Sequence, residues 1–443
     1  MLADSRNTPS GLTRARLVMD VLVGSVQQRR FAVRYWDGTT DAPASVEALP
    51  FTLVIKSPGA LRRLCCAPSE LRLGEAFVRG DLDVDGDLEE ATTLAEDIAV
   101  RLASPRALAT LVRRALALPD SDGEMPAGAE ARARDRRGRR HSRARDHAAI
   151  RFHYDVGNEF YAVWLDRAMI YSCAYFETGD ETIDEAQRAK LDHICRKLRL
   201  QPGERLLDIG CGWGALVRHA ARCYGVSATG VTLSARQAAW ARERIAAEGL
   251  GEVCAVEVMD YRDVPAREFD KIVSVGMVEH VGRSRLGTYF RQAYALLAPG
   301  GLFLNHGIIA LTAAAPRRLA GWVRRTVWRE GAFLDRYVFP DGEILPLDDM
   351  VRQAERAGFE TRDVESLREH YVLTLRAWVH RLTERQREAI RVVGAEAYRT
   401  WRLYMMASAH AFATGRIGLA QTLFAKPDHA GHTRLPLTRA DLY

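Results

Sequence analysis

Polar side chains that can exchange protons stand near the ends of two predicted strands in the second half of the chain. Glu279 and His280 follow one apolar run, and His306 follows the next. A buried carboxylate is costly unless it has a partner or a task, and histidine titrates near neutral pH. We therefore expect Glu279 and His306 to act in an active site. The structural alternatives are a capping role for Glu279 and a hydrogen-bonded core position for His306.

A glycine-rich turn, LLDIGCGWG at residues 206–214, indicates a cofactor site beside these residues. An apolar run ends in Asp208, and alternating glycines then let a ligand approach the backbone closely. A dinucleotide site favours G-x-G-x-x-G and an acid about 20 residues further on, but no acid ends the next strand, VSATGVTLS. The pattern resembles class I S-adenosylmethionine (SAM) methyltransferases; another nucleotide or a purely structural turn is the alternative.

Polar residues after the next two predicted strands extend this site. Thr232, Ser234 and Gln237 follow the second strand, where the ribose and methionine groups of SAM would lie. Asp260 and Tyr261 follow the third strand, where they would bracket an adenine. Polar atoms fix a ligand while an aromatic ring packs against it.

The elements that must position these residues alternate between strand and helix from residue 206 onward. This order predicts an α/β, Rossmann-like, doubly wound and mostly parallel sheet, with ligands at the carboxyl ends of the strands. We expect strands at 206–210, 227–232, 253–258, within 269–281 and at 301–309, and helices at 214–224, at 234–248 and one ending near 298. The aromatic-rich segment 151–176 is expected to cover the pocket.

The chain divides into three predicted parts. Residues 1–118 form a smaller α+β domain that includes one helix from about 88 to 117. Residues 119–148 form a linker, because almost no large apolar side chains occur there. Residues 149–443 form the catalytic domain. An insertion at about 312–356 is interpreted as a lid over an apolar substrate, with an ordinary helical insertion as the alternative.

Charge and composition favour a membrane surface as partner. The net charge is +6, and eight arginines lie between residues 132 and 145. Each can contribute about 1 kcal/mol beside anionic lipid; a solvated tether is the alternative. No aromatic residues interleave these arginines, so we expect no nucleic acid. Neither an apolar run of roughly 18 residues nor a signal peptide is evident, so the expected location is cytoplasmic.

Metal sites and disulfides are not expected. The seven cysteines are scattered without a C-x-x-C pair. The run DLDVDGD at 81–87 imitates the start of a calcium loop, but Thr92 stands where that loop requires glutamate.

Longer motifs link the chain to one family. HYDVGNEFY (153–161), YSCAYF (171–176), SVGMVEHVG (274–282), NHGI (305–308) and AFATGRIG (411–418) accompany the glycine turn. Together they resemble the cyclopropane-fatty-acyl-phospholipid synthases and, in the catalytic part, the mycolic acid cyclopropane synthases. LGEAFVRGDLDVDG in the N-terminal part is a weaker match to the full-length phospholipid enzymes. One departure is Ser408, where some members carry cysteine.

The resemblance implies methylene transfer from SAM to the cis double bond of an unsaturated acyl chain in a phospholipid, forming a cyclopropane ring. In the family the base is a bound bicarbonate ion. Its ligands here would be Glu279, His306, Tyr371, Cys173 and the backbone around Ile308. The SAM contacts carried over are Tyr171, Ser172, Asp208, Gly210, Cys211, Gly212, Trp213, Gly214, Thr232, Leu233, Ser234, Gln237, Asp260 and Tyr261.

Other functions remain open from the sequence. A related enzyme could methylate the same alkene and leave a methylene branch, or the chain could methylate the nitrogen of a small amine. A lipid-binding module with an inactive SAM fold is the alternative from another class. We expect the N-terminal domain and linker to dock on the phospholipid bilayer at the inner face of the cell membrane. The family also favours a homodimer.

Overall fold

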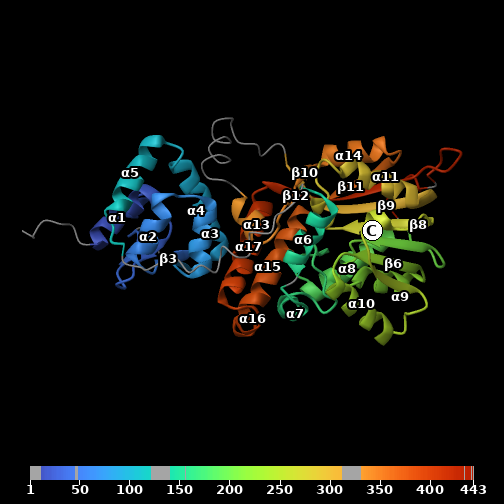
Figure 1. The fold of residues 1–443 in the computed structure, drawn as a ribbon, viewed down its shortest axis with the longest axis horizontal. Helices are drawn as coiled ribbons and strands as arrows, with labels where there is room; N and C mark the ends of the chain where they lie inside the picture. The colour runs from blue at the N-terminus through green and yellow to red at the C-terminus, as the bar shows by residue number, and fades with distance from the viewer. Residues whose placement is uncertain are drawn as a thin grey trace, which may run out of the picture. The chain divides into compact units, whose positions relative to one another are not determined.

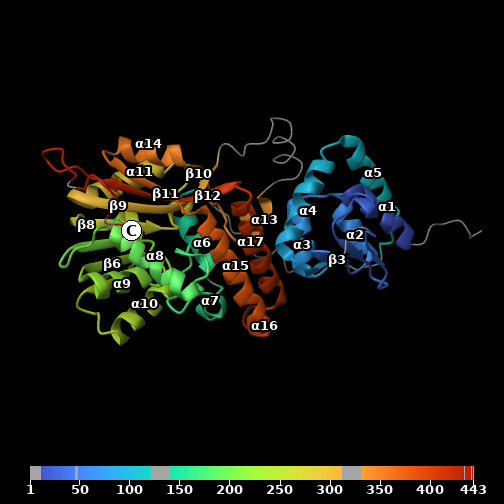
Figure 2. The ribbon, with the colours of Figure 1, turned by 180° about the vertical axis from the view of Figure 1, so that it is seen from behind.

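A computed structural model describes residues 11–44, 48–120, 140–154, 156–311, 331–433, 435–440 and 442. The chain divides into two compact units, which Figures 1 and 2 show from opposite sides. The N-terminal unit comprises residues 1–135, 315–338 and 393–410, and the catalytic unit comprises residues 136–314, 339–392 and 411–443. The sequence-based division instead placed 315–338 and 393–410 in the catalytic domain.

The N-terminal unit contains a four-stranded sheet in the order β2-β1-β3-β4. Its strands are β1 (Ala32–Arg34), β2 (Thr40–Asp41), β3 (Phe51–Ile55) and β4 (Leu82–Gly86), and β1 runs parallel to β3. Helices α1 (Gly11–Val23), α2 (Pro58–Cys66), α3 (Glu70–Arg79), α4 (Leu88–Arg101) and α5 (Pro105–Leu116) accompany the sheet. They bury an apolar core that includes Val18, Leu53, Leu64, Ile98 and Leu111.

The single helix expected from about 88 to 117 is wrong, because α4 ends at Arg101 and α5 begins at Pro105. Proline lacks the N–H that would continue α4, and its fixed φ suits the first turn of a new helix. Asp87, the last residue of the acidic run, caps α4 by accepting hydrogen bonds from the backbone of Glu89 and Glu90. This run therefore serves as strand β4 and a helix cap.

The catalytic unit is built on an eight-stranded sheet. The strand order is β11-β12-β9-β8-β5-β6-β7, and β10 pairs with β9. Strands β5 to β9 run parallel, whereas β12 lies antiparallel between β9 and β11. The strands are β5 (Arg205–Ile209), β6 (Ser227–Thr232), β7 (Cys254–Val258), β8 (Phe269–Val275), β9 (Leu297–Ala310), β10 (Leu345–Pro346), β11 (Glu360–Ser366) and β12 (Ile417–Ala425).

Helices cover both faces of this sheet, as Figure 1 shows. On one face lie α8 (Ile183–Lys197), α9 (Ala215–Tyr224) and α10 (Ala235–Ala247), and on the other lie α11 (Leu286–Leu296) and α14 (Leu347–Arg356). Adjacent residues of a strand point to opposite faces, so Leu206 packs in the first layer and Leu207 in the second. The strands and helices predicted from residue 206 to about 298 are thereby confirmed.

The fifth predicted strand is longer than expected. β9 begins at Leu297, before the predicted start, where Leu297 pairs with Phe269 of β8, and it ends at Ala310, where β12 and the short β10 pair with its last residues. His306 therefore lies within β9, opposite Val275 at the end of β8, and not at the tip of its own strand.

Further helices belong to the two units. They are α6 (Arg143–Tyr154), α7 (Asn158–Trp164), α13 (Ala332–Tyr337), α15 (Arg368–Glu384), α16 (Gln386–Val393) and α17 (Ala395–Ala413). α6 begins inside the predicted linker, whose residues 121–139 lie outside the described part of the chain, as do residues 312–330 of the predicted lid. No helix among the described residues is both long and apolar enough to cross a bilayer.

Candidate active site

A cavity of about 150 Å³ lies at the carboxyl ends of the central parallel strands. All of the predicted cofactor-binding residues except Gly214 and Ser234 line it. Those two residues instead precede helices: Gly214 stands before α9, and the Ser234 hydroxyl caps α10 by accepting from the backbone N–H of Gln237 at 3.3 Å. The cavity also contains polar residues that the sequence analysis did not assign, namely Asp146, Lys190, Arg262, His280 and Arg285.

The glycine turn forms the floor of this cavity. Gly210 has a φ of 83°, in the left-handed region that favours glycine, and a Cβ there would stand 3.0 Å from the side chain of Met277. Asp208 is buried near the end of β5. Burial raises the pKa of its carboxyl to about 7, although the positive charge of Lys190 acts to lower it. The turn thus presents bare backbone and one buried carboxyl to a ligand.

The segment 169–172 forms a second wall, held by helix α8. Gln187 donates to the backbone carbonyl of Ser172 at 2.8 Å, and the Lys190 ammonium donates to the Ser172 hydroxyl at 2.8 Å. The Tyr171 ring packs against Trp378, with 5.3 Å between ring centroids. These contacts fix both predicted cofactor residues in place.

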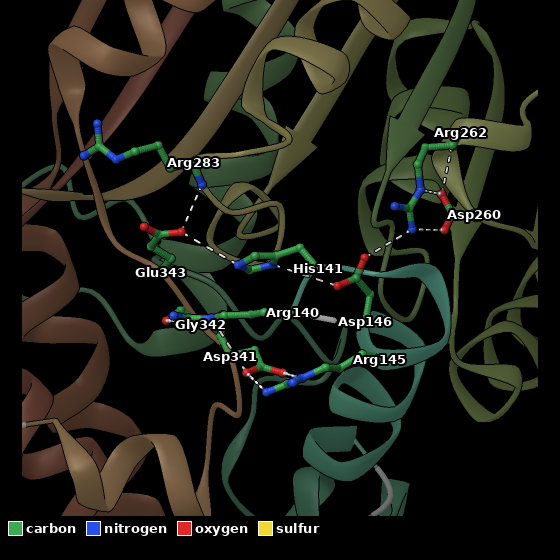
Figure 3. Close-up of polar contacts among 10 residues, drawn as sticks. All are labelled: Arg140, His141, Arg145, Asp146, Asp260, Arg262, Arg283, Asp341, Gly342 and Glu343. Carbon is green, nitrogen blue, oxygen red and sulfur yellow. Dashed lines mark hydrogen bonds and ion pairs between the residues drawn. The ribbon is translucent and has the colours of Figure 1, made fainter. Parts of the chain in front are cut away.

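A chain of charged groups closes the cavity beside Asp260, as Figure 3 shows. Arg262 donates to the Asp260 carboxylate at 2.5 Å and to Asp146 at 3.2 Å, while its guanidinium lies 5.5 Å from the centroid of the Tyr261 ring. Burial opposes ionisation of Asp260, but the hydrogen bonds and charge of Arg262 prevail and lower its pKa. Asp260 is therefore held as a carboxylate at the cavity wall.

Asp146 belongs to a segment, residues 140–146, that was predicted to be part of the linker. Arg145 forms two hydrogen bonds to Asp341, at 2.6 and 2.8 Å. The His141 ring lies between Asp146 and Glu343, with nitrogen-to-oxygen distances of 3.9 and 3.7 Å (Figure 3). The 140–146 segment thus connects the cavity to the 341–343 loop. One sequence signal could have pointed to Asp146, since it is the only acid in the basic stretch 136–147.

The predicted catalytic groups Glu279 and Ile308 lie together beyond the end of β8. The Glu279 carboxylate accepts a hydrogen bond of 2.7 Å from the backbone N–H of Ile308 through Oε1. Its Oε2 atom is buried and has no hydrogen-bond partner among the described residues. Burial raises the pKa of Glu279 to about 6, although the Ile308 N–H acts in the opposite direction. This carboxyl therefore holds a proton more readily than an exposed glutamate.

His306 is 1% exposed and presents a second buried atom without a partner. Its Nδ1 lies 3.2 Å from the side-chain amide of Gln421, while its Nε2 has no hydrogen-bond partner among the described residues. Burial lowers the pKa of His306 well below its usual value, so the ring is neutral at pH 7. A neutral imidazole keeps one nitrogen as donor and the other as acceptor.

Cys173 and Tyr371 both lie near the start of α15. The Cys173 thiol lies 3.8 Å from the Leu367 carbonyl, and Thr374 accepts from the backbone N–H of Ala174 at 3.0 Å. Tyr371, one turn into the helix, packs its ring on Phe412 with centroids 4.7 Å apart. Burial raises the pKa of the Cys173 thiol, so this group is neutral. None of the five predicted catalytic residues lines the 150 Å³ cavity.

Comparison with known proteins identifies relatives along most of the chain. A family model described as mycolic acid cyclopropane synthetase matches residues 141–422, and a domain of unknown function matches residues 18–99. A probable fatty acid methyltransferase from Pseudomonas putida is 42% identical over 414 residues, covering 93% of this chain and 95% of that protein. The cyclopropane-fatty-acyl-phospholipid synthase of Escherichia coli (strain K12) is 38% identical over 274 residues, covering 62% of this chain and 66% of that protein.

Solved structures agree with the fold of the catalytic unit. The cyclopropane synthase MmaA2 from Mycobacterium tuberculosis superposes with a TM-score of 0.59 and 34% identity, covering 63% of this chain and 97% of that one. The mycolic acid cyclopropane synthase CmaA1, solved with S-adenosylhomocysteine (SAH), gives the same TM-score at 33% identity. The chain belongs to the mycolic acid cyclopropane synthetase family and is a SAM-dependent methyltransferase.

Proposed function

We propose that the protein transfers a methylene group from SAM to the cis double bond of an unsaturated acyl chain in a membrane phospholipid, forming a cyclopropane ring. The observation that carries the proposal is the pair of buried atoms Glu279 Oε2 and His306 Nε2, which lack partners among the described residues. Such atoms cost free energy unless a ligand completes their hydrogen bonds. They lie beside the end of β8, next to the strand ends that line the cofactor cavity.

The proposed reaction consists of methyl transfer followed by ring closure. The π electrons of the alkene attack the methyl carbon of the sulfonium, and the carbon–sulfur bond breaks to release SAH. A carbocation remains on the acyl chain. Loss of a proton from the transferred methyl group leaves its electron pair to form the last bond of the ring. Since water would capture the cation, the protein must keep this site dry and must hold a base there.

The residues present fit a bicarbonate ion as that base. When bound, the ion would supply the oxygen that accepts the proton. Glu279, His306, Tyr371, Cys173 and the backbone around Ile308 would hold it. A Glu279 carboxyl whose pKa is raised to about 6 can donate a proton to a neighbouring anion, whereas two ionised groups would repel. Likewise the neutral His306 ring can donate from Nε2.

A second candidate is methylation of the same alkene without ring closure, which leaves a methylene-branched chain. Two relatives that cover more than 90% of this chain favour it, one from Pseudomonas putida and one from Mycobacterium tuberculosis. Both are described as probable fatty acid methyltransferases. The two products differ in which proton is lost. Both are heavier than the substrate by one CH2, so mass does not distinguish them.

Docking on the bilayer is proposed for the N-terminal unit and the arginine-rich linker, at the inner face of the cell membrane. Supporting this are exposed apolar side chains on three helices of the unit: Leu17 on α1, Val100 on α4 and Leu116 on α5 are 41%, 70% and 55% exposed. Arg113 and Arg114 lie with Leu116 in the last turn of α5. Vesicle co-sedimentation with and without anionic lipid tests this.

The homodimer expected from the family stays a prediction, to be checked by analytical ultracentrifugation.

The experiment that decides the chemistry uses purified protein, SAM with a labelled methyl group, and vesicles of cis-unsaturated phospholipid. We expect label in the lipid and upfield cyclopropane-ring signals in the proton NMR spectrum of the extracted fatty acids. Exomethylene signals without ring signals would establish the second candidate instead. Label that enters a small amine but never lipid would overturn both and support an N-methyltransferase.

A further inference from the structure

Helix α8 carries two buried lysines whose surroundings differ. Lys197 is 0% exposed and is paired with two carboxylates, Glu365 at 2.6 Å and Asp363 at 3.1 Å. Lys190, two turns earlier, is 2% exposed but forms no ion pair with a carboxylate of the described chain. A buried ammonium is costly without an opposite charge. Lys190 therefore lacks the direct ion pair that Lys197 has.

Lys190 lines the cofactor cavity and makes its hydrogen bond to another residue of the cavity wall. Its ammonium donates to the Ser172 hydroxyl oxygen at 2.8 Å. Because the oxygen accepts this bond, the hydroxyl hydrogen is directed elsewhere. The neighbouring Ser172 carbonyl is already occupied by Gln187. The two side chains together offer a positive charge and a hydroxyl donor on one wall, which is the chemistry that recognises an anion.

SAM carries a positive sulfonium, a positive amino group and one carboxylate on its methionine part. The carboxylate is its only anionic group. We propose that Lys190, together with the Ser172 hydroxyl, binds the methionine carboxylate of SAM. The assignment makes Lys190 a cofactor-binding residue, and the SAM carboxylate supplies the ion-pair partner that Lys190 lacks among the described residues. It rests on the use of SAM alone and does not depend on which acyl product the enzyme forms.

The electrostatics of the cavity agree with this assignment. Burial lowers the pKa of Lys190 to about 8, although the charges of Asp166, Cys173 and Asp208 act in the opposite direction. A ligand carboxylate beside the ammonium would favour its charged form. The carboxyl of Asp208 on the same cavity wall is complementary to the amino group of the same methionine part.

The test compares SAM with decarboxylated SAM, which lacks only the carboxylate, by isothermal titration calorimetry in the absence of lipid. Hydrogen bonds to charged groups contribute about 1.5–3 kcal/mol. We therefore expect the wild-type protein to bind SAM about tenfold or more tighter than the decarboxylated form. In Lys190→Met this ratio should fall toward one. Lys197→Met is the matched control, since it removes a buried lysine of the same helix outside the cavity and should keep the ratio.

Two results overturn the proposal. One is equal affinity of the wild-type protein for both ligands. The other is a Lys190→Met variant whose affinity falls by the same factor for SAM and for decarboxylated SAM. That result would show that Lys190 only supports Ser172. Should Lys190→Met fail to fold, Ser172→Ala and Lys190→Arg replace it. We expect the ratio of the two affinities to fall in Ser172→Ala and to be retained in Lys190→Arg. An unchanged ratio in Ser172→Ala contradicts a shared site. Failure of methyl transfer to lipid would leave these binding ratios unaffected.

Discussion

The side-chain amide of Gln421 lies 3.2 Å from Nδ1 of His306, and both residues are buried. They face each other across the antiparallel pairing of β12 with β9. When the amide nitrogen donates to Nδ1, the imidazole carries its own proton on Nε2, the atom that has no partner among the described residues. Gln421 thus selects the tautomer of His306 that can donate a hydrogen bond to an anion.

Replacing this amide should slow catalysis without weakening cofactor binding. In Gln421→Met the volume is nearly conserved, but Nδ1 loses its donor and the ring can take the wrong tautomer. We expect kcat to fall about tenfold, equivalent to about 1.4 kcal/mol, with the Kd for SAM unchanged. Rates of label transfer to lipid and calorimetry measure the two quantities. Thr422→Val, an adjacent buried position of β12, is the control and should keep its rate. Equal rates in both variants would show that Gln421 has no such role.

Removing the proton held by Glu279 should have a larger effect. Glu279→Gln keeps an oxygen that can accept from the Ile308 N–H, so the local structure should persist. The amide cannot share a proton with an anion, however. We expect turnover to fall at least about 100-fold, with SAM affinity within a few-fold of wild type.

The control is Glu268→Gln, a substitution at an exposed glutamate. If Glu279→Gln turned over at the wild-type rate, the proposed base site would be wrong, even if lipid were still methylated.

The fold of the catalytic unit could be predicted because its signals are local. Strand β5 is apolar on both faces, and the glycines that follow it are needed for a left-handed turn. Helix starts and stops follow from the same kind of signal: Pro105 favours the start of a new helix, whereas a single helix was expected from about 88 to 117. The start of β9 at Leu297 was not predictable, because it depends on a pairing with Phe269 of β8 that the local sequence does not show.

The site was only partly predictable for the same reason. The sequence motifs predicted the cavity correctly, but a motif does not distinguish residues that contact a ligand from their neighbours in the chain. Gly214 and Ser234 were therefore predicted to bind the cofactor, although they stand at the starts of helices. Asp146 was missed because its partner Arg262 lies 116 residues away. Lys190 was missed because a lysine on a helix gives no sign of whether it is buried beside a carboxylate or a cavity. These pairings arise from tertiary structure and leave no local pattern.

The contact between Gly282 and His141 provides a test of the 140–146 segment. A Cβ at Gly282 would stand 2.3 Å from Nε2 of His141, so Gly282→Ala should displace this ring and, with it, Asp146 from Arg262. We expect the Kd for SAM to rise several-fold, since Asp146 and Arg262 line the cavity.

Gly249→Ala is the matched control for this substitution. It has the same left-handed backbone, with a φ of 68° against 72° at Gly282, but nothing within 4 Å of the new Cβ. Both variants should lose about 1 kcal/mol of stability from backbone strain, and only Gly282→Ala should lose SAM affinity. Equal SAM affinity in the two variants would show that the 140–146 segment does not support the cofactor site.

The ion pair between the buried Lys197 and the half-buried Glu365 predicts how stability depends on pH. Burial raises the pKa of Glu365, but the hydrogen bond from His193 and the charge of Lys197 prevail and lower it to about 2. A carboxyl whose pKa is lower in the folded state stabilises the protein above its unfolded pKa of about 4.3, and this stabilisation is lost as the pH falls toward 2.

Glu365→Gln should therefore reduce the free energy of unfolding at pH 7 by about 3 kcal/mol, because it leaves the Lys197 ammonium with Asp363 alone. The variant should also lose less stability than wild type between pH 5 and pH 3, the range in which wild-type Glu365 takes up its proton on unfolding. Urea denaturation at pH 7, 5, 4 and 3 measures both effects. Glu360→Gln, in an exposed pair with Arg362, is the control and should follow the wild-type curve. Parallel acid slopes in wild type and Glu365→Gln would mean that other carboxyls, and not Glu365, govern acid unfolding.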